Sequence, residues 1–237
     1  MALFSSPQGA IRAVLLAQVL LGAAIVVLDL RGSGGAAAPG LFAPPAQGPS
    51  VRPYRPDLRP AAPGTPAMRP MPEALRFTAE EGAIRITGQI APGDADAFVA
   101  WLDQARPAET RVALDSSGGS VSDALAIGRT IRAAGYTTEV EGGAVCMSAC
   151  PYMLAGGVER TVDGGGIVGV HQHYFGENTM LPAFMAVEDV QLGQASVMDY
   201  LTEMGVDLRL MSHALRTPPE EINILTPEQM TDLKLTT

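Results

Sequence analysis

Short apolar strands that alternate with amphipathic helices constrain the fold of this chain more than any other feature of its sequence. Apolar runs and alternating patterns predict strands at residues 75–78, 83–88, 111–114, 137–140 and 167–171. Apolar residues at helical spacing predict helices at about 94–105 and 121–134. Strands and helices in this order form parallel βαβ units with right-handed crossovers. We therefore expect an α/β domain whose functional residues lie at the carboxyl ends of its strands.

Three strand ends carry residues typical of a serine hydrolase. Ser148 lies at the corner between a strand and a short helix, and His171 ends a second apolar strand. A serine hydroxyl is a weak nucleophile until a neighbouring imidazole accepts its proton. Backbone N–H groups at a glycine-rich turn, such as the one at Gly119, hold an oxyanion well. We predict Ser148 as the nucleophile, His171 as the base, and the N–H groups of Gly119 and Ala149 as the oxyanion hole.

Three segments, at residues 114–127, 143–157 and 169–172, resemble the signature segments of the ClpP peptidase family within the ClpP/crotonase superfamily. Their order and spacing match that family, and the similarity extends from about Leu75 to Leu235. The resemblance implies a ββα superhelix of repeated βαβ units for residues 74–237. It also implies the same roles for Ser148, His171 and the two N–H groups, and assembly into a homo-oligomer through a long helix at about 182–204.

The third catalytic position departs from the family pattern. The resembling family has an aspartate where this chain has Ile222. An amide oxygen fixes the tautomer of an imidazole, so we predict Asn223 as the residue that orients His171. Glu221 is an alternative, and a serine-histidine dyad without a third residue is another.

The two cysteines, Cys146 and Cys150, flank the predicted nucleophile. They fit two interpretations equally. In the first, both cysteines are simply small apolar residues buried under a tight turn. In an oxidising compartment, a pair four residues apart at a strand-to-helix corner also suits a disulfide.

The front of the chain differs in composition from the rest. An apolar run from Ala13 to Leu28 predicts a membrane anchor in residues 1–31, and a cleaved signal sequence ending near Ala36–Ala38 is the alternative. Residues 32–73 are rich in proline, alanine and glycine, a composition that favours a disordered linker. We expect a single-pass inner-membrane protein whose C-terminal domain lies in the periplasm, or else a secreted periplasmic protein.

The charge distribution and the histidine content indicate which ligands and partners to expect. The formal net charge is −9, and the acidic residues are concentrated after the linker, which argues against nucleic acid as a partner. His171 and His173 point the same way along a strand, but no acid cluster adjoins them. We therefore expect no metal.

These features together favour an exported serine peptidase that hydrolyses peptides or unfolded chains without a cofactor. We expect no ATP-dependent unfoldase, because ATP is scarce outside the membrane. A catalytically inactive scaffold or binding protein of the same fold is the main alternative, and the isoleucine at position 222 favours it. An acyl-CoA enzyme of the crotonase type is a further alternative.

Overall fold

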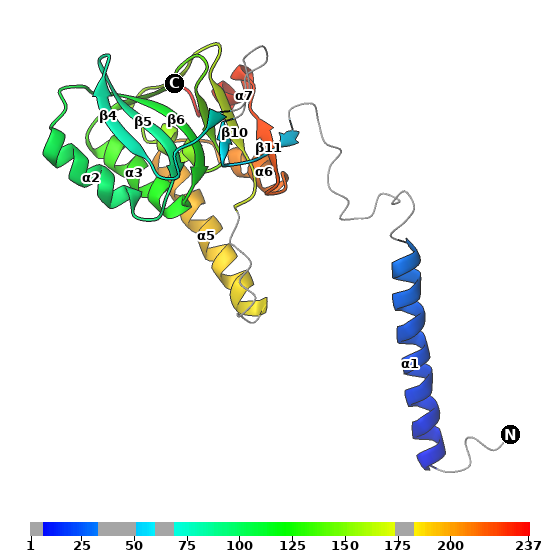
Figure 1. Cartoon of the computed structure of the whole chain (residues 1–237). Helices are drawn as coiled ribbons and strands as arrows, with labels where there is room; N and C mark the ends of the chain where they lie inside the picture. Colours follow the sequence, from blue (N-terminus) through cyan, green and yellow to red (C-terminus); the bar gives the residue numbers. More distant parts are fainter. Residues whose placement is uncertain (1–6, 33–50, 60–68, 174–182) are drawn as a thin grey trace. The chain divides into compact units, whose positions relative to one another are not determined.

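The computed structural model describes residues 7–32, 51–59, 69–173 and 183–237, which belong to two compact units divided between Pro45 and Ala46 (Figure 1). The first unit holds α1. The helices are α1 (Pro7–Gly32), α2 (Asp94–Ala105), α3 (Val121–Ala133), α4 (Cys150–Ala155), α5 (Ala183–Glu203), α6 (Arg209–Leu215) and α7 (Pro227–Asp232). The strands are β1 (Val51–Pro53), β2 (Leu58–Arg59), β3 (Arg69–Pro70), β4 (Arg76–Glu80), β5 (Ala83–Ile90), β6 (Arg111–Gly119), β7 (Thr137–Val140), β8 (Val145–Met147), β9 (Arg160–Val162), β10 (Ile167–Val170) and β11 (Glu221–Ile224).

The helix α1 covers most of the segment for which the sequence predicts an anchor. No helix among the described residues is both long enough and apolar enough to cross a membrane, so the expected transmembrane helix is not found there.

The second unit is built on a nine-stranded sheet in which most neighbouring strands run parallel. Its main path has the order β1-β11-β10-β8-β6-β5-β4, and β7 and β9 branch from it at β6. The pairs β5–β6, β6–β8 and β8–β10 are parallel, whereas β4, β11 and β1 join antiparallel to their neighbours. The predicted α/β class is therefore confirmed.

The strand β6 divides its pairing between two partners. Residues Arg111 to Ala113 pair with β7, while Ser116 pairs with Cys146 of β8. The first half of β6 thus belongs to the branch with β7 and β9, and its carboxyl end lies beside β8. This division brings the glycines at the end of β6 next to the predicted nucleophile.

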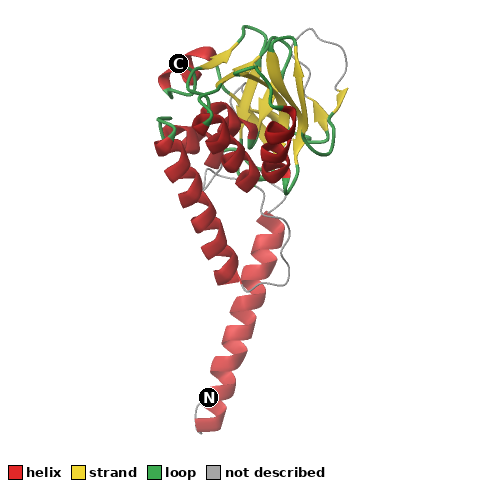
Figure 2. Cartoon of the chain, turned by 90° about the vertical axis from the view of Figure 1, so that its left-hand side faces the viewer, coloured by secondary structure: helices red, strands yellow, loops and turns green. Residues whose placement is uncertain are grey.

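Helices α2 and α3 pack side by side against the strands β4 to β6 (Figures 1 and 2). On α3, Ala124, Ile127 and Ile131 are fully buried. On α2, Phe98 is fully buried and its ring lies 5.2 Å from that of Phe77 on β4. Burial of a side chain of this size stabilises the fold by about 1.5–3 kcal/mol. This apolar layer holds the strands whose ends form the site.

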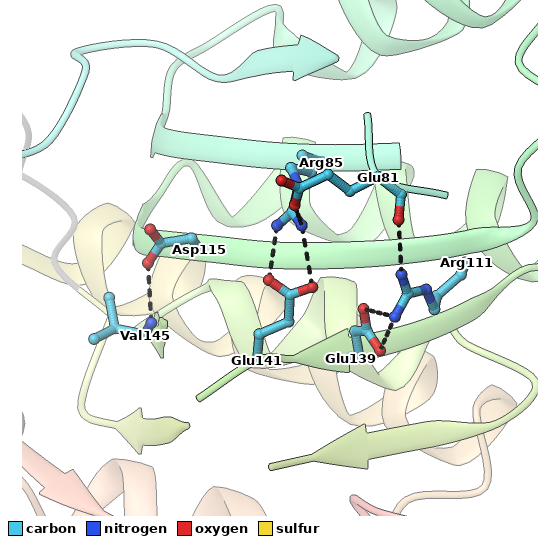
Figure 3. A network of polar contacts seen from close by, with 7 residues as sticks. All are labelled: Glu81, Arg85, Arg111, Asp115, Glu139, Glu141 and Val145. Carbon is cyan, nitrogen blue, oxygen red and sulfur yellow. Dashed lines mark hydrogen bonds and ion pairs between the residues drawn. The ribbon is translucent and has the colours of Figure 1, made fainter. Parts of the chain in front are cut away.

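Polar side chains fix the register of the central strands (Figure 3). Arg85 on β5 binds Glu141 at 2.7 Å, and Arg111 on β6 binds Glu139 on β7 at 2.9 Å. Asp115 on β6 accepts a hydrogen bond from the N–H of Val145 at 3.0 Å, where β8 begins. Because the arginines are partly exposed, the ion pairs contribute little stability. Their effect is to align β5, β6 and β7, while Asp115 aligns β8 with β6.

The linker predicted for residues 32–73 is wrong for its described part beyond residue 50. The strand β1 pairs antiparallel with β11, and β2 and β3 form a two-stranded sheet. Tyr54 and Met71 are buried, with exposed fractions of 8% and 7%. Proline is tolerated in an edge strand, as at Pro53. The burial of Tyr54 and Met71 against the domain offsets the conformational entropy that the segment loses, which composition alone does not reveal.

The long helix predicted at about 182–204 corresponds to α5, whose C-terminal part is buried through Val197, Tyr200 and Leu201. Farther towards its N-terminal end, Val187 and Leu192 are exposed, and both views show this part projecting from the body of the second unit (Figures 1 and 2). One face of α5 therefore packs in the core, and the projecting part presents apolar side chains to its surroundings.

Candidate active site

Ser148 occupies a sharp corner between β8 and α4. Its φ is 61°, in the left-handed region, which costs a non-glycine residue about 1–2 kcal/mol. The N–H of Ser148 donates to the carbonyl of Gly169 on β10 at 2.9 Å, which ties the corner to the neighbouring parallel strand. A strained strand-to-helix turn that presents a serine side chain is typical of a nucleophile elbow.

A disulfide joins Cys146 and Cys150 across this corner. Both residues are fully buried, one in the middle of β8 and the other at the first residue of α4. The bond closes a loop that contains only the corner itself. It therefore restricts the relative directions of the strand and helix that meet at Ser148.

Two arginines hold the other end of α4. Arg132 donates to the carbonyls of Gly156 and Gly157, each at 2.8 Å. Arg160 is 5% exposed and donates to Ala155 O at 3.4 Å and to Gly157 O at 3.3 Å, and it also binds Leu235 O at 3.1 Å. Burial lowers the pKa of Arg160, but its carbonyl partners satisfy the charged guanidinium. The short helix is thus fixed at both ends.

Gly118 allows β6 to pass directly over the corner. Its φ is +87°, and a Cβ placed there would lie 2.6 Å from Ser148 Cβ and 2.9 Å from Ala149 N. Gly119 is similarly constrained, because an added Cβ would lie 2.2 Å from the carbonyl of Ile90. Only glycine fits both positions without movement of the backbone. The close approach places the turn that carries Gly119 beside the N–H of Ala149, the two groups predicted to hold an oxyanion.

The imidazole of His171 lies between the serine and a backbone carbonyl. Nε2 lies 2.7 Å from Ser148 Oγ, and Nδ1 lies 2.7 Å from Pro219 O. A carbonyl oxygen only accepts hydrogen bonds, so in the neutral ring the proton must be on Nδ1. Nε2 is then the unprotonated nitrogen, able to accept the proton of Ser148.

The environment of His171 keeps this ring neutral near neutral pH. Burial lowers the pKa of His171, while backbone groups of Pro219, Glu221 and Pro218 and the charge of Glu220 raise it by smaller amounts. Since burial is the dominant effect, the net direction is downward. The ring is therefore in the form that a general base requires.

Asn223 does not take the role predicted for it. Its side chain on β11 lies 3.3 Å from Nδ1 of His213, whereas Nδ1 of His171 is bound by Pro219 O. In the antiparallel pairing, Asn223 lies opposite Val170, one residue before the histidine. The chain before β11 passes closer to the imidazole, so a main-chain oxygen occupies the place of a side-chain acceptor.

Ser148 and His171 open into a cavity of about 890 Å³. The ends of β6, β8 and β10 form its floor, with Gly119 among its lining residues. Val121 and Leu125 of α3 and Gly193 of α5 contribute to its walls. Its size is that of a small-ligand or peptide side-chain site, and most of its lining is apolar.

His173 lies near Ser148 and His171 but contacts a different partner. Its Nε2 lies 2.7 Å from Tyr152 Oη, and burial, with a smaller contribution from His171, lowers the pKa of His173 to about 4. Both ring nitrogens of His171 are used in the contacts to Ser148 and Pro219. The two histidines thus serve separate hydrogen-bonding groups.

Tyr54 is the residue of the site that the sequence did not indicate. It follows β1, lines the cavity, and its ring meets the ring of His171 edge-on at 4.9 Å between centroids. An aromatic residue in a proline-rich stretch gives no signal that it packs on His171, more than a hundred residues later in the chain. A buried contact of this kind is visible only in three dimensions.

In comparisons with known proteins, no protein-family model and no curated sequence matches the chain.

Proposed function

We propose that this chain is a ClpP-like serine peptidase that cleaves peptides or unfolded polypeptides. The observation that carries the proposal is the 2.7 Å contact between Ser148 Oγ and His171 Nε2, made at a corner where the serine has a positive φ. Nucleophile and base within hydrogen-bonding reach, with the base held in turn by a third group, is the arrangement of activated serines. The parallel sheet and the order of the three segments support the ClpP/crotonase type of superhelix.

In the proposed reaction, Ser148 Oγ bonds to the peptide carbonyl carbon while its proton passes to His171 Nε2. The carbonyl oxygen becomes an oxyanion, which the N–H groups of Gly119 and Ala149 stabilise. Collapse of this intermediate breaks the C–N bond, and His171 returns the proton to the departing nitrogen. Water then attacks the acyl-enzyme with His171 again as base, releasing the acid and restoring Ser148.

The carbonyl of Pro219 supports this role for His171 without a carboxylate. Replacing a catalytic aspartate by asparagine damages serine proteases because the amide favours the wrong imidazole tautomer. A backbone carbonyl has no donor and so favours the productive tautomer. It carries only a partial charge, so we expect it to stabilise the imidazolium less than an aspartate does.

The cavity favours a substrate with an apolar side chain next to the cleaved bond. Among the described residues that line it, none is a lysine or arginine, which the phosphates of an acyl-CoA would require. This supports a peptide over the crotonase-type substrate. Short or unfolded chains suit the site without a partner unfoldase.

We further propose that the protein acts in the periplasm, either secreted or attached at the inner membrane. The disulfide at Cys146 and Cys150 supports an oxidising compartment. Exposed Val187 and Leu192 on the projecting part of α5 support assembly into a homo-oligomer. Cell fractionation tests the location, and light scattering of the purified protein tests the assembly.

The alternative is a catalytically silent scaffold of the same fold. The observation that favours it is the acceptor on His171, a carbonyl where the resembling family has a carboxylate. The two proposals differ in one measurable property, the reactivity of Ser148.

Labelling of the full chain with a fluorophosphonate probe distinguishes them. We expect the parent protein to be labelled, and Ser148→Ala and His171→Ala to lose the label. Ser212→Ala is the matched control, because Ser212 is an exposed serine on α6 outside the cavity. Absence of labelling in folded parent protein would support the scaffold, and retained labelling in Ser148→Ala would contradict the assignment of the nucleophile.

A further inference from the structure

The segment from Val51 to Asp57 crosses the active site from the edge of the sheet. The strand β1 pairs with β11, and the N–H of Tyr54 donates to Glu220 O at 2.8 Å, one residue from the carbonyl that binds His171. We call residues 51–57 the crossing segment. Its backbone is thereby attached to the turn that holds the catalytic base.

Within this segment, Tyr54 touches two of the strands that form the site. Its ring meets His171 edge-on, with ring centroids 4.9 Å apart and an interplanar angle of 72°. Its hydroxyl donates to the carbonyl of Ser117 on β6. Burial raises the pKa of Tyr54 well above its usual range, so the phenol remains a neutral donor. One side chain thus links the base to the strand that carries the oxyanion turn.

A second hydrogen bond joins the same two segments, this time with Ser117 as the donor. The hydroxyl of Ser117, a fully buried residue, donates to Pro56 O at 2.7 Å. Ser117 therefore exchanges hydrogen bonds with two residues of the crossing segment. Because Ser117 directly precedes Gly118, these bonds fix the peptide from which the turn at Gly119 begins.

The imidazole needs more than one point of attachment to keep its orientation. The bond from Nδ1 to Pro219 O fixes one atom, and the contact of Nε2 is to Ser148, the group proposed to react. Tyr54 supplies a second surface and covers one side of the ring from water. Tyr54 is 8% exposed and lines the cavity without closing it, since Ser148 remains partly accessible beside it.

We propose that Tyr54 is a positioning residue that orients His171 towards Ser148 and joins it to the oxyanion turn through Ser117. This inference rests on the proposed function of the Ser148–His171 pair. It assigns an active-site role to a segment that its composition marks as a linker. The role is non-covalent, and Tyr54 does not itself transfer a proton.

Two readouts test the proposal on the full chain: NMR titration of His171, assigned with His171→Ala, and the rate of fluorophosphonate labelling over a pH series. The groups that face His171 are Tyr54, Glu220, His173 and Ser148, so the substitutions leave the charged ones in place. Tyr54→Ala exposes the ring to water, which weakens the desolvation that lowers the pKa of His171. We expect the titration midpoint to move up towards its ordinary value, and labelling to slow about 10–100-fold.

Tyr54→Phe and Arg55→Ala complete the set. The phenylalanine keeps the ring edge and loses only the bond to Ser117, so we expect the His171 midpoint of the parent and a labelling rate within about threefold. Arg55 is the exposed neighbour that pairs with Asp57 outside the cavity, and its loss should change neither readout. An unchanged His171 midpoint in folded Tyr54→Ala would overturn the proposal, as would a labelling rate of that variant equal to the parent rate.

The titration separates this inference from the proposed function. Labelling could fail in the parent protein because Ser148 is not activated, which would end the peptidase proposal. The effect of Tyr54 on the pKa of His171 would still be measured by NMR, and its absence would independently show that Tyr54 does not position the ring.

Discussion

The two halves of the candidate site are held in different ways. The nucleophile half is local: Ser148 lies between cysteines two residues to either side, and their disulfide closes the corner. The base half depends on distant parts of the chain, because His171 is bound by Pro219, 48 residues later, and packed by Tyr54, far earlier in the sequence. Gly118 is the point where a distant strand touches the local corner.

The two halves therefore have different requirements: the backbone of Ser148 is strained, whereas the side chain of His171 only has to be oriented. The corner holds Ser148 in a backbone conformation that costs free energy, so its supports must resist relaxation. The imidazole is in an ordinary position, and its supports only choose one orientation among several. We therefore expect changes at the corner to reduce activity strongly, and most changes around the base to tune it.

The largest effect should follow from Gly118→Ala. The added Cβ would lie 2.5 Å from Met147 O and 2.6 Å from Ser148 Cβ, so the strand or the corner must move. A displacement of about 1 Å at a catalytic group reduces rates about 100-fold, and we expect at least this loss in fluorophosphonate labelling.

Gly135→Ala is the matched control for this substitution. Gly135 also has a positive φ, +69°, but an added Cβ would meet no atom within 4 Å. It should lose about 1 kcal/mol of stability and keep its labelling rate. Normal labelling in Gly118→Ala would show that the corner does not depend on the close passage of β6.

The double substitution Cys146→Ala with Cys150→Ala tests the local support. Without the disulfide, Ser148 is free to leave its left-handed conformation for one that does not present the hydroxyl to His171. If the relaxed conformation is more stable by about 1.4 kcal/mol, the labelling rate falls about tenfold. We also expect chemical denaturation to report about 2 kcal/mol less stability, the amount for closing a short loop. An equal labelling rate with lower stability would mean that packing alone maintains the corner.

Asn223→Ala tests whether a side chain or the main chain orients the base. The substitution removes the contact between Asn223 and His213, which is partly buried, so the free energy of unfolding should fall by about 1 kcal/mol. Labelling should stay within about twofold of the parent rate, since Pro219 O still binds His171. A loss comparable with that of His171→Ala would restore Asn223 as the orienting residue.

The smallest effect should come from Glu220→Gln. The negative charge of Glu220 raises the pKa of His171, so removing it should lower that pKa further. Labelling requires the neutral imidazole. The pH below which labelling is lost should therefore decrease. The shift should be small and should shrink in high salt, because Glu220 is exposed and screened. Labelling over a pH series at two salt concentrations measures it, and a shift towards higher pH would contradict the assigned sign.

Much of the architecture follows from local patterns. The alternating strands and helices predicted the parallel sheet. Ser148 and His171, proposed from their places at strand ends, lie in direct contact. These features depend on periodicity and on the fixed geometry of parallel strands, both of which are written in the order of residues.

Two features of the site had no such signal. The acceptor on His171 is a backbone carbonyl, a group that every residue carries, so no residue type at position 219 marks it. The crossing segment and the stretch around Met71 both have the composition of a linker, yet Tyr54 and Met71 are buried against the domain. Each segment is ordered because it packs against other parts of the domain, and its own composition carries no information about those contacts.

The sequence alone therefore determined which chemical groups are present and at which strand ends they emerge, because side-chain type and strand periodicity are local properties. It also contains glycines at positions 118 and 119, but only the structure shows which atoms lie too close to them for a larger residue. The tertiary structure decided which groups meet: Gly118 against Ser148, Pro219 O on His171, and Tyr54 between the base and Ser117. The physical reason is that these contacts join segments distant in the chain, and their energy depends on distances that only packing sets.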